Sequence, residues 1–254
     1  MCETKKQHFL RGGGIIMSIE TFKILPQNAF AYWINDSYKN IYSKGKSLSS
    51  FGLAKKGLST GDNDYFFRYW FEVNFQKEKF DSSDSFQAMF SGKKWFPINK
   101  GGAYRKWYGN NDFVVNYENN GKELLSFKYS IIRNSKYYFL DSLTWTDLTS
   151  GNISFRYNKK GFIHDVAGPC IFNLDSNLPI IFGILNSKVI NSLLTFSSPT
   201  LHYNIGSISE LPIILPLDKD FQIVKDFVEI CVAICKKDWD SFETSWDFEK
   251  HPLI

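Results

Sequence analysis

The 254-residue chain is long enough to bury a sizeable core, and its net charge of +4 excludes a uniformly basic nucleic-acid-binding protein. Its 17% aromatic content favours a β-rich fold, because aromatic rings are enriched in strands. Polar residues interrupt the most apolar run, Leu178 to Leu194, so this run does not have the continuous apolar character of a transmembrane helix. Four cysteines and a polar, Gly-rich N-terminus predict a reduced, cytoplasmic protein with free thiols.

The first half of the chain has the pattern of a β-rich domain. Residues 1–18 predict a flexible leader, since they contain three consecutive glycines and no apolar run. From about residue 22 to 172, short apolar or alternating runs are separated by Asn, Asp, Ser and Gly, as at Asn119-Asn120-Gly121. The predicted strands are Tyr65–Phe75, Asp112–Tyr117, Tyr137–Leu140, Ile153–Tyr157 and Gly161–Val166.

Helical periodicity replaces this pattern towards the C-terminus. One helix is predicted over Ile180–Phe196 and a clearer one over Asp220–Lys236, whose apolar stripe includes Cys231 and Cys235 in core-packing positions. Leu211–Pro216 between them is expected to be extended. The acidic, aromatic segment from Trp239 has the composition of one that packs on a surface, and we expect that surface to lie outside this chain. The predicted fold class is therefore α+β, with a β-rich domain over residues 19–216 and a helical extension over residues 217–254.

Motifs of several common enzyme classes are absent from the sequence. It contains no Gly-x-Gly-x-x-Gly turn, no phosphate-binding Gly-x-x-x-x-Gly-Lys-Ser/Thr loop and no Gly-x-Ser-x-Gly elbow. The Asn/Asp-Pro-Pro-Tyr/Phe signature that holds a flipped adenine is also missing. We therefore predict no catalytic, cofactor-binding or metal-binding residues in this chain.

Two polar-aromatic blocks have the composition of a recognition surface. The first, Gly57–Asn63, presents backbone N–H groups, a hydroxyl and an amide, which bind phosphates or base edges; an ordinary turn before a strand is the alternative. The second contains five basic residues and no acid from Lys93 to Lys106, interleaved with rings and glycines. The alternative for this block is a solvated loop that Trp95 and Trp107 anchor to the core.

The order of these blocks resembles a known family. The motifs that carry the resemblance are Gly57-Leu58-Ser59-Thr60-Gly61-Asp62-Asn63, Lys94-Trp95-Phe96-Pro97, Arg105-Lys106-Trp107-Tyr108-Gly109-Asn110, Leu185-Asn186-Ser187-Lys188 and Glu243-Thr244-Ser245-Trp246-Asp247-Phe248. From about Ile19 onward, the chain is similar to the C-terminal target-recognition region of BREX-type adenine-specific DNA methyltransferases, relatives of type IIG restriction–methylation enzymes.

The resemblance implies a function. Residues 19–216 would form a DNA target-recognition domain, and double-stranded DNA and a methyltransferase catalytic domain or subunit would be the partners. Whole enzymes of this family use S-adenosylmethionine as cofactor, and their catalytic motifs lie upstream of the matched region, so we expect this chain to be inactive alone. The implied DNA-binding residues are Thr60, Asn63, Arg68, Lys94, Lys100, Arg105, Lys106, Trp107 and Asn110.

Two other classes of protein remain open from the sequence. A carbohydrate-binding β module would stack Trp95, Trp107 and Tyr108 on sugars. A stand-alone interaction protein would dock its C-terminal segment, from Trp239 onward, on a separate methyltransferase subunit. Salt-dependent DNA binding distinguishes the first alternative, and co-purification with a catalytic chain distinguishes the second.

Overall fold

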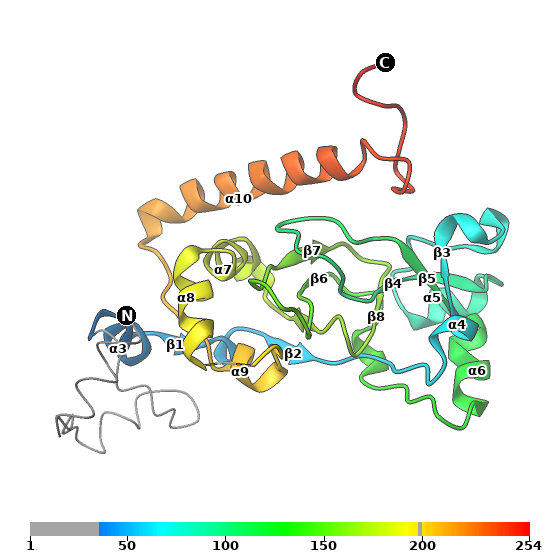
Figure 1. Cartoon of the computed structure of the whole chain (residues 1–254), viewed down its shortest axis with the longest axis horizontal. Helices are drawn as coiled ribbons and strands as arrows, with labels where there is room; N and C mark the ends of the chain where they lie inside the picture. Colours follow the sequence, from blue (N-terminus) through cyan, green and yellow to red (C-terminus); the bar gives the residue numbers. More distant parts are fainter. Residues whose placement is uncertain (1–35, 198–199) are drawn as a thin grey trace, which may run out of the picture.

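The computed structural model describes residues 36–197 and 200–254 (Figure 1). The predicted leader over residues 1–18 and the start of the predicted domain at residue 19 lie outside the described residues. The helices are α3 (Asp36–Lys44), α4 (Asn63–Phe66), α5 (Ser85–Phe90), α6 (Glu118–Ser126), α7 (Leu178–Leu185), α8 (Lys188–Ser197), α9 (Ile205–Ser209) and α10 (Asp218–Trp239). The strands are β1 (Lys46–Ser47), β2 (Leu53–Lys55), β3 (Phe67–Tyr69), β4 (Trp95–Asn99), β5 (Phe113–Asn116), β6 (Ser142–Thr144), β7 (Arg156–Asn158), β8 (Ile163–His164), β9 (Cys170–Phe172) and β10 (Pro212–Ile213).

The strands form two four-stranded sheets and one short two-stranded sheet. The first sheet has the order β2-β9-β6-β7, and the second has the order β3-β5-β4-β8. Pairing is antiparallel except between β4 and β8. In the small sheet, β1 pairs with β10, so the segment expected to be extended at Leu211–Pro216 ties the C-terminal part back to the N-terminal one. Together with the helices, this architecture confirms the α+β class.

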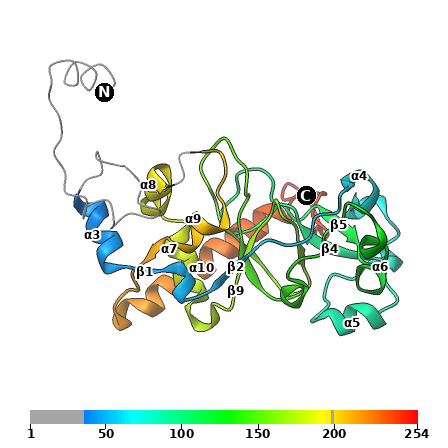
Figure 2. The same ribbon diagram turned by 90° about the horizontal axis from the view of Figure 1, so that it is seen from below.

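Each large sheet has its own hydrophobic core. Trp145 and Phe155 lie in the first core with residues of α7, α8 and α10. Phe96 and Phe139 lie in the second core with residues of α4 and α6. In Figure 1 and Figure 2, α3 and β1 lie at one end of the molecule and α4, α5 and α6 at the other.

Four of the five predicted strands contain or overlap an observed strand. Asp112–Tyr117 contains β5, and Gly161–Val166 contains β8. Ile153–Tyr157 overlaps β7 in its last two residues. Of Tyr65–Phe75, only β3 is a strand. Asp62 accepts a hydrogen bond from the backbone N–H of Tyr65 and so begins the short helix α4, and 3-10 turns at Trp70–Glu72 and Phe75–Lys77 follow β3.

The predicted strand at Tyr137–Leu140 is wrong. Its first residue ends a 3-10 turn at Ser135–Tyr137, and Phe139 has a left-handed backbone with φ of 69°. That conformation breaks the alternation a ladder needs. The run is apolar because Tyr138 and Phe139 are buried in the second core, which is a packing requirement and not a strand signal.

The single helix predicted over Ile180–Phe196 is two helices. Helices α7 and α8 are bent by 70° at Asn186 and Ser187. Asn186 ends α7 and uses its side-chain amide to pair with the backbone of Phe155, accepting from its N–H at 3.1 Å and donating to its carbonyl at 3.1 Å. A buried amide that pairs like a strand residue competes with helix continuation. In the described part of the chain, no single helix has the length and apolar character needed to cross a membrane; α7 and α8 meet those criteria only as this bent pair.

The last helix agrees with its prediction. Helix α10 contains the predicted span Asp220–Lys236 and extends it by one turn at the C-terminal end. Its predicted inner stripe faces α7: Val228 is buried, and Val224 packs against the first core. Cys231 and Cys235 are free thiols and half-buried on the same helix. In Figure 1, α10 crosses the outer side of α7 and runs towards the second sheet.

Candidate nucleic-acid interface

The structure distributes the basic block Lys93–Lys106 over several places. Strand β4 occupies its centre, so residues 96–99 are buried. Lys94 precedes the strand, with its ammonium 5.6 Å from the ring centroid of Trp95. Lys100 follows the strand at the opposite end. The continuous stretch of cations in the sequence is therefore not one continuous patch on the surface.

Lys100 caps a ladder of aromatic rings. Its ammonium lies 4.9 Å from the ring centroid of Phe67 and 4.6 Å from that of Phe113. Tyr69 stacks on Phe113 at 4.6 Å and on Phe71 at 5.3 Å. Tyr69 and Phe71 are exposed and Lys100 is half-buried, so the ladder presents two stacked rings to solvent and holds a cation at its inner end. Arg68, on the same strand, donates to the carbonyl oxygens of Phe67 and Asp64.

Lys93 donates to the carbonyl oxygen of Gln76, and the last two cations of the block, Arg105 and Lys106, face the C-terminal helices. The Arg105 guanidinium lies 4.8 Å from a ring centroid of Trp239, and its Nη1 is 3.6 Å from Oδ2 of Asp238. Lys106 donates to the carbonyl oxygen of Asn186 at 2.7 Å. Both side chains are half-buried. Each therefore joins the loop after β4 to a helix, whatever contact it makes with a ligand.

Trp107 and Asn110 shape the same loop. Both have left-handed backbones, with φ of 72° and 63°, and Trp107 exchanges backbone hydrogen bonds with Phe155 and Tyr157. The Trp107 ring meets Phe182 edge-on at 4.9 Å, which makes it a packing anchor. The Asn110 amide is buried and donates to the carbonyl of Ala103 at 2.8 Å. Tyr108 is buried as well, so Trp107 and Tyr108 do not form an open platform for a sugar.

The first block lies in another part of the molecule, beside β8. The Leu58 N–H donates to the carbonyl of His164 at 3.0 Å, and the Val166 N–H donates to the carbonyl of Leu58 at 3.0 Å. Gly57 is required there, because a Cβ at this position would lie 1.6 Å from the carbonyl oxygen of His164. Burial lowers the pKa of His164 to about 3, so the histidine is neutral and structural.

The turn that follows is closed by its own polar side chains. The Thr60 hydroxyl, which is buried, donates to Oδ1 of Asn63 at 2.6 Å. Asn63 itself is exposed and begins α4. Of the two predicted contacts in this turn, Asn63 is presented to solvent, whereas Thr60 positions it.

A basic segment that the sequence prediction missed lies beside this turn. Ser59 and Ile131 exchange backbone hydrogen bonds of 2.9 and 2.8 Å, and Asn134 donates its amide to the carbonyl of Lys56 at 2.8 Å. We call the Thr60–Asn63 turn together with residues 128–136 the turn–loop surface. Its exposed cations and ring are Lys128, Tyr129, Arg133 and Lys136. The available signal was the absence of any carboxylate between Glu123 and Asp141.

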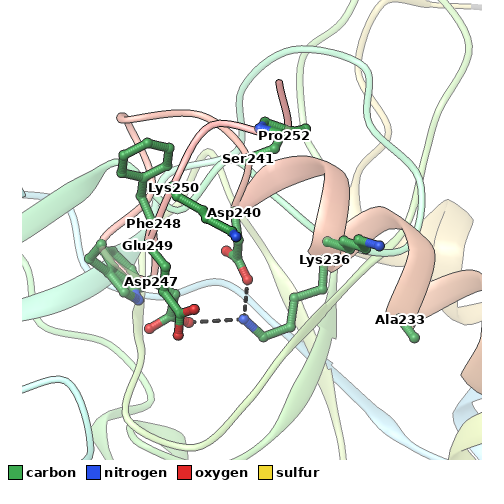
Figure 3. A pocket seen from close by; sticks show the side chains of 11 residues that line it. Ala233, Lys236, Asp240, Ser241, Asp247, Phe248, Glu249, Lys250 and Pro252 are labelled. Carbon is green, nitrogen blue, oxygen red and sulfur yellow. Dashed lines mark hydrogen bonds and ion pairs between the residues drawn. The ribbon is translucent and has the colours of Figure 1, made fainter. Parts of the chain in front are cut away.

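The C-terminal segment packs on the chain itself, which corrects the expectation that its surface lies outside. The Trp70 indole donates to the carbonyl of Thr244 at 2.8 Å, and Trp246 contacts the ring of Phe80 at 4.7 Å. Figure 3 shows the groove between this segment and the end of α10, where Lys236 reaches Asp240 and, at 3.0 Å, Asp247. These two carboxylates raise the pKa of Lys236 above its ordinary value. The segment therefore joins α10 to the second sheet.

Comparison with known proteins matches the chain to a segment of larger proteins. No family model matches it. Its homologues are adenine-specific methyltransferases, of which it corresponds to a part.

Two relatives are similar over 92% of this chain. Adenine-specific methyltransferase BrxX of Escherichia coli O9:H4 (strain HS) is 39% identical over 238 residues, which are 18% of that protein. Adenine-specific methyltransferase PglX of Lacticaseibacillus casei (strain Zhang) is 36% identical over 243 residues, which are 20% of that protein. The chain thus spans about a fifth of the length of the curated relatives it matches.

Proposed function

We propose that this chain recognises a specific sequence in double-stranded DNA, as the specificity part of a site-specific adenine-N6 DNA methyltransferase that acts in phage defence. The observation that carries the proposal is the similarity of 92% of the chain to a segment of two adenine-specific methyltransferases. Methyl transfer to one adenine in a defined site needs a part that reads sequence as well as a part that performs the chemistry.

The turn–loop surface supports this proposal. Lys128, Arg133 and Lys136 are exposed on one loop, and long cationic side chains of this kind neutralise phosphates. Asn63 on the adjoining turn supplies an amide, the group that pairs with the adenine edge in the major groove. Cations and an amide on two hydrogen-bonded segments thus combine positioning on the backbone with base readout.

The aromatic ladder gives a second element of the interface. Lys100, Arg68 and the exposed rings of Tyr69 and Phe71 lie on or beside β3, which follows the Thr60–Asn63 turn through α4. In a duplex, exposed rings of this kind make apolar contacts with thymine methyl groups at the base edges. We assign the phosphate contacts to Lys128, Arg133 and Lys136 of the turn–loop surface, and the base-proximal contacts to Asn63, Arg68 and the ladder.

S-adenosylmethionine is the methyl donor expected for the complete enzyme. Within the described ranges, no glycine-rich turn joins a strand to a helix and precedes an acidic residue, which is the usual arrangement for a nucleoside cofactor. The residues present therefore do not fit that group, and the proposal assigns its binding and the transfer chemistry to a catalytic domain or subunit that partners this chain.

The experiment that tests the proposal is fluorescence anisotropy of the purified chain with a random-sequence duplex, from about 50 to 200 mM salt. Binding that weakens steeply over this range indicates several phosphate contacts. Selection from a randomised duplex pool then measures specificity, and enrichment of one asymmetric site is the expected result. Retention of no duplex at the lowest salt, or enrichment of no sequence, contradicts the proposal.

A further inference from the structure

Helix α10 carries a second apolar stripe on its outer side. Val224 and Val228 face α7 and the first core, but Ile223, Phe227, Ile230 and Ile234 are exposed. Their exposed fractions are 54%, 64%, 53% and 63%. In Figure 1 the outer side of α10 lies along the edge of the molecule, away from both sheets. A surface helix with one partnered face normally has polar residues on its other face, so this stripe is unusual.

The spacing of the stripe is that of a coiled-coil seam. The four apolar residues follow one another at intervals of four, three and four positions. Asp220 continues the seam three positions before Ile223, and Lys237 continues it three positions after Ile234. Alternating intervals of three and four keep one seam facing a partner helix.

The charges at the two ends of the seam specify the partner. An identical helix in parallel orientation would place Asp220 against Asp220 and Lys237 against Lys237. In antiparallel orientation, Asp220 lies opposite Lys237 at both ends, Ile223 lies opposite Ile234, and Phe227 lies opposite Ile230. Every layer is then complementary under a twofold axis, which is the requirement for an interface between identical surfaces. In the described part of the chain, neither Asp220 nor Lys237 forms a salt bridge that would compete with this pairing.

We propose that α10 docks antiparallel on the α10 helix of a second copy of this chain. Four apolar side chains from each copy form the centre, and the Asp220–Lys237 pairs close its ends. The surface buried by this seam is smaller than the about 1,600 Å² of a standard interface, so we expect weak association that is detected only at high protein concentration. The proposal is independent of DNA binding, because no residue of the seam belongs to the interface described above.

Sedimentation velocity of the full chain, without DNA, tests the proposal over about a hundredfold range of concentration. A shift from monomer to dimer is expected. Ile230→Asp should raise the dissociation constant at least about tenfold. Phe86→Asp is the matched control, because Phe86 is 73% exposed on α5 and should leave the constant unchanged. All of these positions are exposed, and circular dichroism verifies that each variant folds.

A charge exchange tests the orientation. Asp220→Lys should weaken the dimer about fivefold, and the double variant Asp220→Lys/Lys237→Asp should restore wild-type affinity to within about twofold. A chain that remains monomeric at every concentration overturns the proposal and leaves the stripe to another partner. A dimer that ignores Ile230→Asp, or one that the second charge change does not restore, overturns it as well.

Discussion

The guanidinium of Arg105 lies 4.8 Å from a ring centroid of Trp239, although 134 positions separate the two residues in the chain. Arg105 belongs to the loop after β4, and Trp239 is the last residue of α10. Gly109 makes room for this contact, because a Cβ there would lie 2.9 Å from the indole ring. The C-terminal end of the basic block and helix α10 therefore form one structural unit.

Replacing Arg105 tests this unit. Arg105→Ala removes the cation–π contact with Trp239, and we expect it to lower the free energy of unfolding by about 0.5–1 kcal/mol. Urea denaturation followed by tryptophan fluorescence measures the change. Lys160→Ala is the control, because Lys160 is exposed and loses the same charge type. Equal stability of the two variants would contradict a structural role for Arg105 and leave DNA contact as its function.

Two cations of the turn–loop surface test the DNA proposal. The double variant Lys128→Ala/Arg133→Ala removes two proposed phosphate contacts, so the slope of log affinity against log salt should fall by about 2. Affinity near 100 mM salt should drop about tenfold. Lys44→Ala/Lys46→Ala is the matched control at the opposite end of the molecule (Figure 1). If both double variants bind DNA equally well in anisotropy titrations, the turn–loop surface is not the interface.

Replacing Asn186 tests how the junction of α7 and α8 is held against Phe155, the residue before β7. The side-chain amide of Asn186 makes both hydrogen bonds to the Phe155 backbone, and its backbone carbonyl accepts a hydrogen bond from Lys106. Asn186→Ala leaves a buried N–H and a buried carbonyl without partners, and we expect a loss of about 1–3 kcal/mol in the free energy of unfolding. Asn191→Ala, on the half-buried side of α8, should cost less. Thermal denaturation compares the melting temperatures of the two variants, and equal values would contradict this role of Asn186.

The buried carboxyl group of Glu78 is expected to make the free energy of unfolding depend on pH. The residue is 6% exposed, and among the described residues neither carboxyl oxygen has a hydrogen-bond partner. Burial raises its pKa from 4.5 to about 7, so the folded state retains a proton that the unfolded state has lost. The stabilisation is complete below pH 4.5 and is lost as pH rises through about 7.

Glu78→Gln is expected to remove this dependence. The variant should match the wild type near pH 4.5 and exceed its free energy of unfolding at pH 8 by roughly 1–3 kcal/mol, because the amide carries no charge to bury. Urea denaturation at several pH values measures the difference. A wild-type protein whose stability advantage over the variant grows with pH would contradict the assignment.

Some elements were predictable because their signals are local. The period of α10 and the alternation in β5 follow from neighbouring residues, since each periodicity reflects which face of one element is buried. Where a segment meets a distant one, the local pattern failed. Phe139 takes its left-handed backbone while pairing with Phe162, and Asn186 bends the helical region by pairing with Phe155.

The candidate site divides in the same way. The amino-acid sequence by itself determined which residue types were available: a basic block without acids, a Thr-Gly-Asp-Asn turn and an amphipathic last helix. Only the tertiary structure decided that Arg105 and Lys106 turn towards α10 and Asn186, and that residues 128–136 adjoin the Thr60–Asn63 turn. The physical reason is that a cation is bound by the ring, carbonyl or carboxylate nearest to it in space, and chain order does not record that neighbour.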